Sequence, residues 1–213
     1  MNTRKNILDC YSKTAEVYAQ KYFGELEHKH FDKMILQHFA RERALAGTVL
    51  DLGCGPGQTT AYLDGLGIKD IIGTDISCEM IDEAKRLSPH IAFETADMLD
   101  LSYPEGRFGS AVAFYAMVHF DYPLLAEAFR SVYKVLKPGG HFLTSFHLGD
   151  EIVHLDHFLD HKVDIDFNFF KMHQVIAVAQ TNGFQLVDAI EREAYSEIEY
   201  PSKRGYLWLK SSR

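Results

Sequence analysis

Residues 49–58 read Val49-Leu50-Asp51-Leu52-Gly53-Cys54-Gly55-Pro56-Gly57-Gln58. The first four residues are mostly apolar, as expected for a strand buried in a sheet, and the glycines that follow predict a tight turn that leads into a helix. Glycine has no Cβ, so its backbone can approach a ligand closely, and a helix N-terminus presents free N–H groups to that ligand. The segment therefore predicts a strand, a glycine turn and a helix beside a bound ligand.

A carboxylate further along the chain specifies this ligand. Asp75 stands 24 residues after Asp51, at the end of the next apolar run. A carboxylate in that position can accept hydrogen bonds from both hydroxyls of a ribose. An isolated GxG pattern is more often an ordinary tight turn, but the strand, the glycines, the helix and the acid in this order predict an adenosine-type ligand.

Short apolar runs alternate with amphipathic stretches from residue 48 onward, which is typical of successive βα units around a mostly parallel sheet. We expect strands at 48–52, 71–75, 91–94, 111–114 and 141–146, and helices at 78–87 and 123–136. The last two apolar runs, 184–195 and 205–209, are separated by a stretch too short for a crossover helix, so they predict an antiparallel pair. The expected fold class is a doubly wound, Rossmann-like α/β sheet.

The first 45 residues predict two helices separated near Gly24, which together form a helical cap. A length of 213 residues indicates a single domain, 1–213. Within it we expect the helical cap (1–45), a cofactor-binding half (46–146), a lid-like insertion (147–170) and a C-terminal helix with antiparallel strands (171–213).

Composition and charge indicate which kinds of molecule the protein binds. The chain has 22 basic and 30 acidic residues, and its net charge of −8 opposes binding to nucleic acid. The longest apolar run, Ala111 to Val118, is well short of the roughly 18 residues of a membrane span, and the N-terminus lacks the apolar core of a signal peptide. Cys10, Cys54 and Cys78 form no CxxC pair. We therefore expect a cytoplasmic protein, a monomer or homodimer, that binds a small molecule rather than nucleic acid or a membrane.

Four motifs in chain order resemble those of class I S-adenosylmethionine-dependent methyltransferases, specifically the bacterial small-molecule type with an N-terminal helical cap. The motifs are Leu50-Asp51-Leu52-Gly53-Cys54-Gly55-Pro56-Gly57, Gly73-Thr74-Asp75-Ile76-Ser77, Ala96-Asp97-Met98 and Val135-Leu136-Lys137-Pro138-Gly139-Gly140. The resemblance covers nearly the whole chain. It implies S-adenosylmethionine as the cofactor, in-line methyl transfer to a small-molecule acceptor, and a seven-stranded sheet whose last strand pair is antiparallel.

The same resemblance implies roles for individual residues. Asp75 would hold the ribose and Asp97 the adenine amino group, while Ile76, Met80 and Met98 would sandwich the adenine ring; ordinary core packing is the alternative for these three. The cofactor-binding residues expected are Tyr11, Tyr18, Asp51, Gly53, Cys54, Gly55, Asp75, Ile76, Met80, Ala96, Asp97, Met98, Phe114 and Tyr115.

Tyr11 and Tyr18 belong to a segment that looks like the family's Tyr-x-x-x-Ala-x-x-Tyr cap helix, in which tyrosines approach the methionine end of the cofactor. Ser12 stands where the family usually has an acid. Both tyrosines also fit a role as core aromatics on an amphipathic helix.

His119 is the candidate general base, because it follows the end of an apolar strand and an imidazole titrates near neutral pH. The alternative is a histidine that only hydrogen-bonds a backbone carbonyl or lines the cofactor site. Tyr115 and Phe120 flank the same opening and are expected to shape the acceptor pocket or to serve plain packing.

The insertion at residues 147–168 carries six acids, one lysine and four histidines. His154, His157 and His161 are spaced three and four residues apart, which predicts one face of a helix and makes a metal site conceivable. A solvated lid helix is the favoured alternative, and we expect no metal. The acidity of the insertion suggests selection of a cationic or amine-bearing acceptor.

Two other functions stay open from the residues. A non-catalytic, regulatory S-adenosylmethionine-binding protein would have the same glycines. An NAD(P)-dependent reductase would use a related fold, but Gln58 occupies the last glycine position of the GxGxxG fingerprint.

Overall fold

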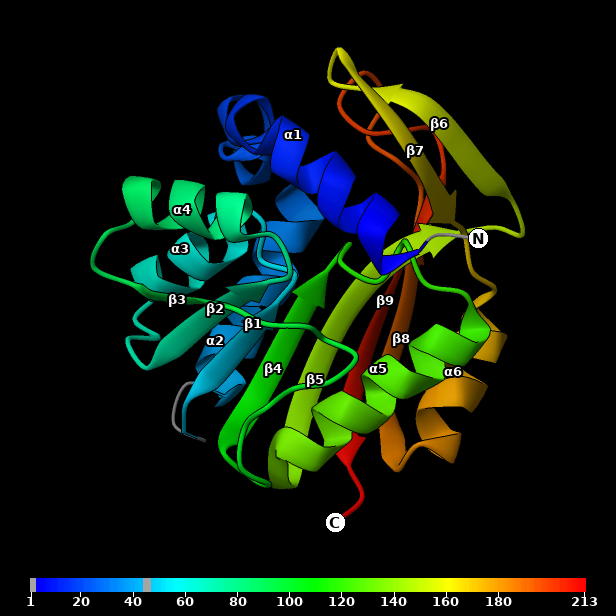
Figure 1. The fold of residues 1–213 in the computed structure, drawn as a ribbon. Helices are drawn as coiled ribbons and strands as arrows, with labels where there is room; N and C mark the ends of the chain where they lie inside the picture. The colour runs from blue at the N-terminus through cyan, green and yellow to red at the C-terminus, as the bar shows by residue number, and fades with distance from the viewer. Residues whose placement is uncertain (1–2, 44–46) are drawn as a thin grey trace.

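A seven-stranded sheet forms the centre of the computed structural model, which describes residues 3–43 and 47–213 (Figure 1). Its strands, in spatial order, are β3 (Ala92–Thr95), β2 (Ile71–Asp75), β1 (Val49–Leu52), β4 (Phe108–Phe114), β5 (Leu136–Leu148), β9 (Lys203–Ser211) and β8 (Phe184–Arg192). The first five strands pair in parallel, whereas β9 is antiparallel to both β5 and β8. The doubly wound fold with its antiparallel last pair is therefore confirmed.

The order of strands reverses between β1 and β4. The chain runs outward from β1 through β2 to β3 and then returns to place β4 on the other side of β1. Loops that leave the carboxyl ends of β1 and β4 therefore separate in opposite directions and leave a crevice, which is where ligands bind in such sheets.

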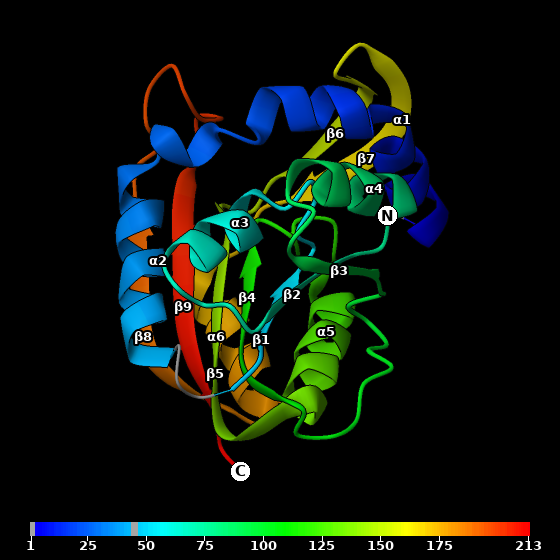
Figure 2. The same cartoon turned by 90° about the vertical axis from the view of Figure 1, so that its left-hand side faces the viewer.

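Helices cover both faces of the sheet (Figure 2). They are α1 (Arg4–Tyr22), α2 (His30–Arg43), α3 (Gln58–Gly65), α4 (Cys78–Leu87), α5 (Tyr122–Val135) and α6 (Met172–Thr181), with a 3-10 turn at Glu25–Glu27. One core cluster joins α2, α3 and α4 to one face, and a second joins α5 and α6 to the other. No helix in the described ranges combines the length and the apolar composition needed to cross a bilayer.

Local signals explain the elements that the sequence predicts best. β2 and α4 have the expected bounds. The helix α4 begins where the Ser77 hydroxyl accepts a hydrogen bond from the Met80 N–H at 3.2 Å, and Lys85 and Arg86 stand in its last turn, where cations are favourable. Similarly, the Asp121 carboxylate accepts from the Leu124 N–H at 3.0 Å at the start of α5.

The two N-terminal helices have different positions. α2 packs against the sheet, where Leu36 and Phe39 are fully buried in one cluster with Trp208. In contrast, α1 lies across the carboxyl ends of the strands and contacts α4 and β7 (Figure 1). The boundary expected between the cap and the cofactor-binding half, at residues 45 and 46, lies outside the described residues.

The insertion is a β-hairpin, so the predicted helix is wrong. β6 (Ile152–Phe158) pairs antiparallel with β7 (His161–Asn168), and Leu159 and Asp160, with φ of 50° and 65°, form the two-residue turn between them. Two consecutive positive φ values match the type I′ turn, whose twist suits a hairpin.

Apolar and polar residues alternate along both strands, and this alternation, rather than the spacing of the histidines, indicates the correct secondary structure. Val153 faces Phe167 and Leu155 faces Ile165, whereas His154 faces Asp166. The apolar side of the hairpin packs on α1 in a small cluster around Cys10, Val163 and Ile165, and the histidines do not share a helical face. Within residues 3–43 and 47–213, no group of three or more His, Cys, Asp or Glu side chains is arranged to hold a metal ion.

The contact between the hairpin and α1 predicts unequal effects of two isoleucine substitutions. Ile165 is fully buried there, whereas Ile152 of β6 is 67% exposed. Ile165→Ala should lower the free energy of unfolding by about 2–4 kcal/mol, because it removes buried methylene groups and leaves a cavity. Ile152→Ala should change it by no more than about 0.5 kcal/mol. Denaturant unfolding measures both, and equal losses would show that this contact does not form.

Candidate active site

A cavity of about 1010 Å³ opens at the carboxyl ends of the strands, in the crevice between β1 and β4. Gly53 and Gly55 after β1, Asp75 at the end of β2 and Tyr115 after β4 line its floor. Side chains of α1 and of the β6–β7 hairpin line it from above, and both figures of the fold place these two elements over the same end of the sheet (Figures 1 and 2).

The turn after β1 requires glycine. Gly53 has a φ of 62°, and a Cβ built on it would lie 2.4 Å from the Cβ of Ala116. Any side chain would therefore push apart the loops after β1 and β4. A Cβ on Gly55, at a φ of 54°, would lie at an ordinary contact distance of 3.9 Å from Gln58 and Tyr18, and all three residues line the cavity.

Backbone groups hold the Asp75 carboxylate in place on the cavity wall. One oxygen accepts the Gly55 N–H at 2.9 Å and the other accepts the Ser77 N–H at 2.9 Å. Burial raises the pKa of Asp75 above its ordinary value, although these N–H groups favour the carboxylate. The carboxylate thus joins the turn after β1 to the start of α4.

Asp97 occupies the wall beyond Asp75. Its carboxylate accepts the Leu99 N–H at 2.9 Å and lies 3.2 Å from Nε of Arg4, an exposed side chain at the start of α1. Ile76 and Met98 line the cavity beside it. An apolar slot that ends at a carboxylate is complementary to a purine ring with an exocyclic amino group, because the slot can pack against the ring and the carboxylate can accept a hydrogen bond from the amino group.

The cavity brings together almost all the residues that the sequence predicts. Its lining includes Tyr11, Tyr18, Gly53, Gly55, Asp75, Ile76, Met80, Ala96, Asp97, Met98, Phe114, Tyr115 and His119. Asp51 and Cys54 do not line it. Burial raises the pKa of Asp51 to about 7, although its carboxylate accepts the Thr60 hydroxyl hydrogen bond at 2.6 Å. Both side chains are buried beneath the glycine turn and support it from outside the cavity.

Sequence reasoning did not identify Gln58, Glu25 and Lys29 as polar residues that line the cavity near the glycine turn. Gln58 Nε2 donates to Glu25 at 3.3 Å, and Lys29 Nζ lies 2.7 Å from the other Glu25 oxygen. The buried Gln58 Oε1 has no hydrogen-bond partner among the described residues, and Gln58 lines the cavity near Gly55. A buried amide oxygen without a donor is costly, so this position fits a ligand's ammonium group. The adjacent Lys29 ammonium fits a carboxylate.

A hydrogen-bonded pair, Tyr11 and His119, faces the other side of the cavity. The Tyr11 hydroxyl lies 2.6 Å from His119 Nε2, and His119 Nδ1 lies 2.9 Å from the backbone oxygen of Asp166. Burial lowers the pKa of His119 to about 4, so the imidazole is neutral at pH 7. His119 therefore both lines the site and bonds a backbone carbonyl.

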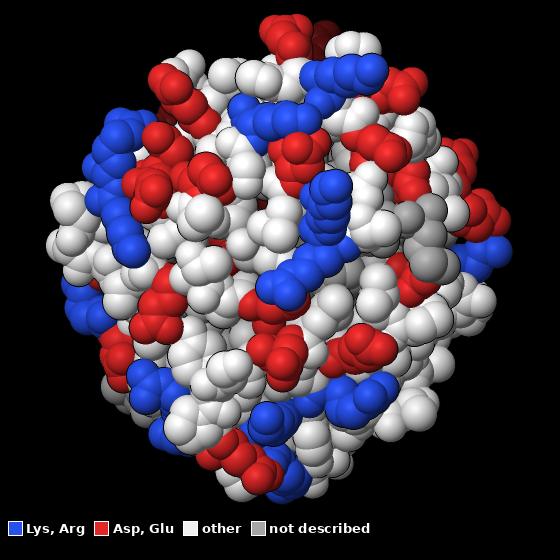
Figure 3. Space-filling view, viewed as in Figure 1, with Lys and Arg blue, Asp and Glu red and all other residues white. Residues whose placement is uncertain are grey.

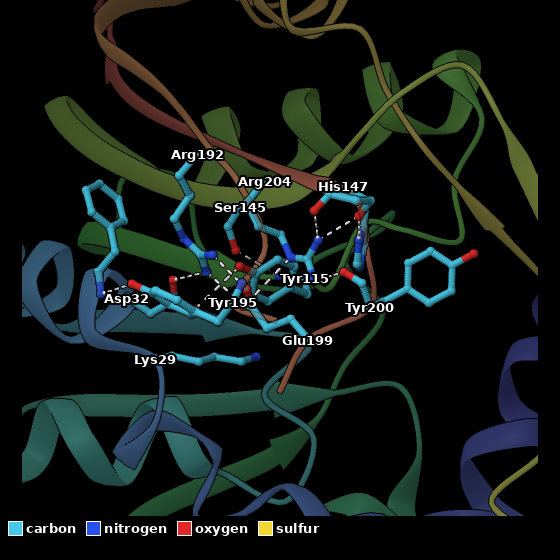
Figure 4. Close-up of polar contacts among 12 residues, drawn as sticks. Lys29, Asp32, Tyr115, Ser145, His147, Arg192, Tyr195, Glu199, Tyr200 and Arg204 are labelled. Atoms are coloured by element: carbon cyan, nitrogen blue, oxygen red, sulfur yellow. Dashed lines mark hydrogen bonds and ion pairs between the residues drawn. The ribbon is translucent and has the colours of Figure 1, made fainter. Parts of the chain in front are cut away.

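A buried polar cluster closes the end of the cavity near β9 (Figure 4). Arg192 lies 3.1 Å from Asp32 and 2.6 Å from Glu199, and Arg204 lies 3.8 Å from Glu199. Although burial raises the pKa of Glu199, the hydrogen bond from Arg192 lowers it to about 2. Tyr115 lies among these groups with a φ of 53°, which is unusual for a residue with a side chain. No local pattern predicts this cluster, because its members come from distant segments.

Comparisons with known proteins identify the family of this chain. The family model "Methyltransferase domain" matches residues 49–140. The uncharacterized methyltransferase YcgJ of Bacillus subtilis (strain 168) is 31% identical over 195 residues, which cover 89% of this chain and 72% of that protein. The sterol 24-C-methyltransferase erg-4 of Neurospora crassa is 30% identical over 152 residues, which cover 65% of this chain but only 40% of that protein.

The fold has close counterparts as well. The CcbJ methyltransferase from Streptomyces caelestis superimposes with a TM-score of 0.70 at 15% identity, covering 95% of this chain and 98% of that chain. The chain therefore belongs to the class I S-adenosylmethionine-dependent methyltransferases. Its cofactor is S-adenosylmethionine, and the reductase alternative is set aside.

Asp75 provides a direct test of the cofactor site. Asp75→Asn should weaken binding of S-adenosylhomocysteine by about 1–3 kcal/mol, because it removes a charged acceptor of hydrogen bonds. Calorimetric titration gives the dissociation constant. Asp82→Asn, on the exposed side of α4, is the matched control and should bind as the unaltered protein does. Equal affinity of the two variants would exclude Asp75 from the site.

His119 also predicts how stability changes with pH. Because its pKa is about 4 in the folded protein and 6.5 in an ordinary histidine, the unfolded chain binds the extra proton between these values. Stability is then full above pH 6.5 and decreases as the pH falls toward 4, by about 3 kcal/mol from this residue.

His119→Gln should remove that part of the acid destabilisation, measured by denaturant unfolding at pH 7.5 and at pH about 4.5. His157→Gln, at an exposed histidine of β6, is the matched control for replacing a histidine by glutamine. An unaltered slope in His119→Gln would show that His119 titrates normally.

Proposed function

We propose that the protein methylates a small molecule enclosed between the sheet, α1 and the β6–β7 hairpin. The observation that carries this proposal is the size and shape of the cavity. Its volume of about 1010 Å³ lies at the upper end of the roughly 300–1,000 Å³ of small-molecule sites, and it extends from the glycine turn to the polar cluster near β9. It has room for a cofactor and a second molecule.

In this proposal the cofactor lies along the carboxyl ends of β1, β2 and β3. Asp75 accepts hydrogen bonds from the ribose hydroxyls and Asp97 accepts one from the adenine amino group. Ile76, Met80 and Met98 contact the adenine. These roles are supported by the position of each side chain on the cavity wall and by the N–H groups that hold both carboxylates.

The methionine end would be held at the glycine turn. Gln58 Oε1 accepts a hydrogen bond from the ammonium group and Lys29 Nζ donates one to the carboxylate, with Tyr18 beside them. The orphaned amide oxygen supports this orientation. When bound, S-adenosylmethionine supplies a methyl group that is already activated, so the protein's tasks are to align the acceptor and to exclude water. The roof formed by α1 and the hairpin serves both tasks.

A small acceptor is favoured over nucleic acid by charge. The net charge is −8, and on the face shown in Figure 3 basic and acidic side chains are interspersed. Cytoplasmic placement is supported by Cys10, Cys54 and Cys78, which are all free thiols. Assembly as a monomer or a homodimer stays a prediction of the sequence.

Turnover distinguishes this proposal from a regulatory protein that only binds the cofactor. Incubation of the purified protein with S-adenosylmethionine and a pool of small metabolites should release S-adenosylhomocysteine, measured by mass spectrometry. Asp75→Asn should release much less at the same cofactor concentration, and Asp82→Asn should match the unaltered protein. Tight cofactor binding without release from any pool would instead favour the regulatory protein.

A further inference from the structure

Three segments far apart in the sequence meet at the Tyr11 hydroxyl. Tyr11 comes from α1, His119 from the loop after β4, and Asp166 from β7. The hydroxyl, the imidazole and the backbone oxygen of Asp166 form a continuous chain of hydrogen bonds, with distances of 2.6 Å and 2.9 Å. Both Tyr11 and His119 line the cavity, so this chain of hydrogen bonds reaches the cavity surface.

The chain has a defined direction. A backbone carbonyl can only accept, so His119 Nδ1 carries the proton that is donated to Asp166. Nε2 of the neutral ring then offers its lone pair, and the Tyr11 hydroxyl donates to it. Burial raises the pKa of Tyr11 well above 10, so the hydroxyl keeps its proton at neutral pH. The Tyr11 oxygen can still accept a hydrogen bond from a group in the cavity.

The cavity wall next to this pair is apolar. The hairpin contributes Val153, Leu155, Phe158 and Phe167 to the lining, and Phe169 follows directly after β7. Its acids Asp156, Asp160 and Asp164 are exposed on the surface, so they do not support selection of a cationic acceptor.

Charged side chains at the other end of the cavity stand beside opposite charges. Near β9, Glu199 lies 3.8 Å from Arg204 and 2.6 Å from Arg192, which itself lies 3.1 Å from Asp32. Such neutralised pairs, together with the apolar hairpin wall, favour an acceptor without a charge of its own.

We propose that Tyr11 is a catalytic residue that takes the proton from a hydroxyl group of an uncharged, apolar acceptor and passes its own proton to His119. The reaction is then O-methylation. This inference rests on the methyl transfer proposed above and specifies its acceptor class.

The step balances in atoms and electrons. The acceptor oxygen forms a bond to the methyl carbon, while the bond from that carbon to the cofactor's sulfur breaks and leaves its electron pair on sulfur. The acceptor's proton moves to the Tyr11 oxygen, and the Tyr11 proton moves to His119 Nε2. The products are a methyl ether, S-adenosylhomocysteine and a protonated His119, which later loses its proton to water.

Electrostatics explains why a buried, weakly basic histidine suits this reaction. Before transfer the only added positive charge is the sulfonium of the cofactor, and His119 is neutral. After transfer the sulfonium charge is gone and the imidazolium carries it instead. The buried cavity therefore holds one added positive charge throughout, and the Asp166 carbonyl stabilises that charge through Nδ1–H.

The test uses simple acceptors and one conservative variant. Naphthol and farnesol are the hydroxyl probes, and naphthylmethylamine and naphthoate are charged probes of similar size. The unaltered protein should methylate at least one hydroxyl probe and neither charged probe. Tyr11→Phe keeps the ring and should lower the single-turnover rate by about 10²–10⁴-fold. Its affinity for S-adenosylhomocysteine should stay within a few fold.

Tyr103→Phe is the matched control, since the Tyr103 hydroxyl bonds Glu94 outside the cavity, and it should keep the full rate. A readout without turnover is nitrogen NMR of His119 in the cofactor-free protein. It should show a neutral ring protonated at Nδ1, with an Nε2 signal that shifts in Tyr11→Phe.

Three results would overturn the proposal: a full rate in Tyr11→Phe, methylation of the charged probes alone or of no hydroxyl probe, or a His119 ring protonated at Nε2. Each of them can occur while the protein still releases S-adenosylhomocysteine with a metabolite pool. Failure of this inference is thus distinguishable from failure of the proposed methyl transfer.

Discussion

The close approach of two loops at Gly53 is the constraint on which the site depends. A Cβ at this position would lie 2.4 Å from the Cβ of Ala116. Because glycine permits the contact, the turn after β1 and the loop after β4 meet at the point where the strand order reverses. The Asp75 carboxylate then ties the same turn to the start of α4 through the Gly55 and Ser77 N–H groups. A cavity wall of defined shape results, in which backbone N–H groups hold the Asp75 carboxylate in place.

The roof of the cavity has a different physical origin. α1 and the β6–β7 hairpin contact each other through a small apolar cluster that includes Cys10 and Ile165. Ser12 adds a link to the other side, since its hydroxyl donates to Glu79 of α4 at 2.6 Å. The serine that replaces the family's usual acid thus connects the cap helix to the cofactor-binding half. A roof built from small contacts suits a site that has to admit and release two molecules.

Elements with strong local signals were predicted correctly from the sequence, whereas the errors came from one misread local pattern and from contacts between distant segments. The bounds of β2 and α4 were correct because an uninterrupted apolar run, a serine cap and basic residues in the last turn are local signals. The insertion was wrong because histidine spacing suggested a helix, while the alternation of Val153, His154 and Leu155 indicated a strand. Lys29 and Arg204 were missed, since nothing near them in the sequence indicates that both face one cavity.

The sequence by itself determined the doubly wound sheet, the glycine turn and the acids at the strand ends, because each depends on residues within one strand and its turn. The tertiary structure alone decided that Asp51 lies beneath the turn rather than in the cavity, and that the Tyr11 hydroxyl meets His119 Nε2. The first outcome depends on how α3 packs beside β1, since the Asp51 carboxylate accepts the Thr60 hydroxyl hydrogen bond. The second depends on how α1 packs over the loop after β4, which joins residues more than a hundred positions apart. Such contacts follow from the burial of complementary apolar faces, and no local pattern encodes them.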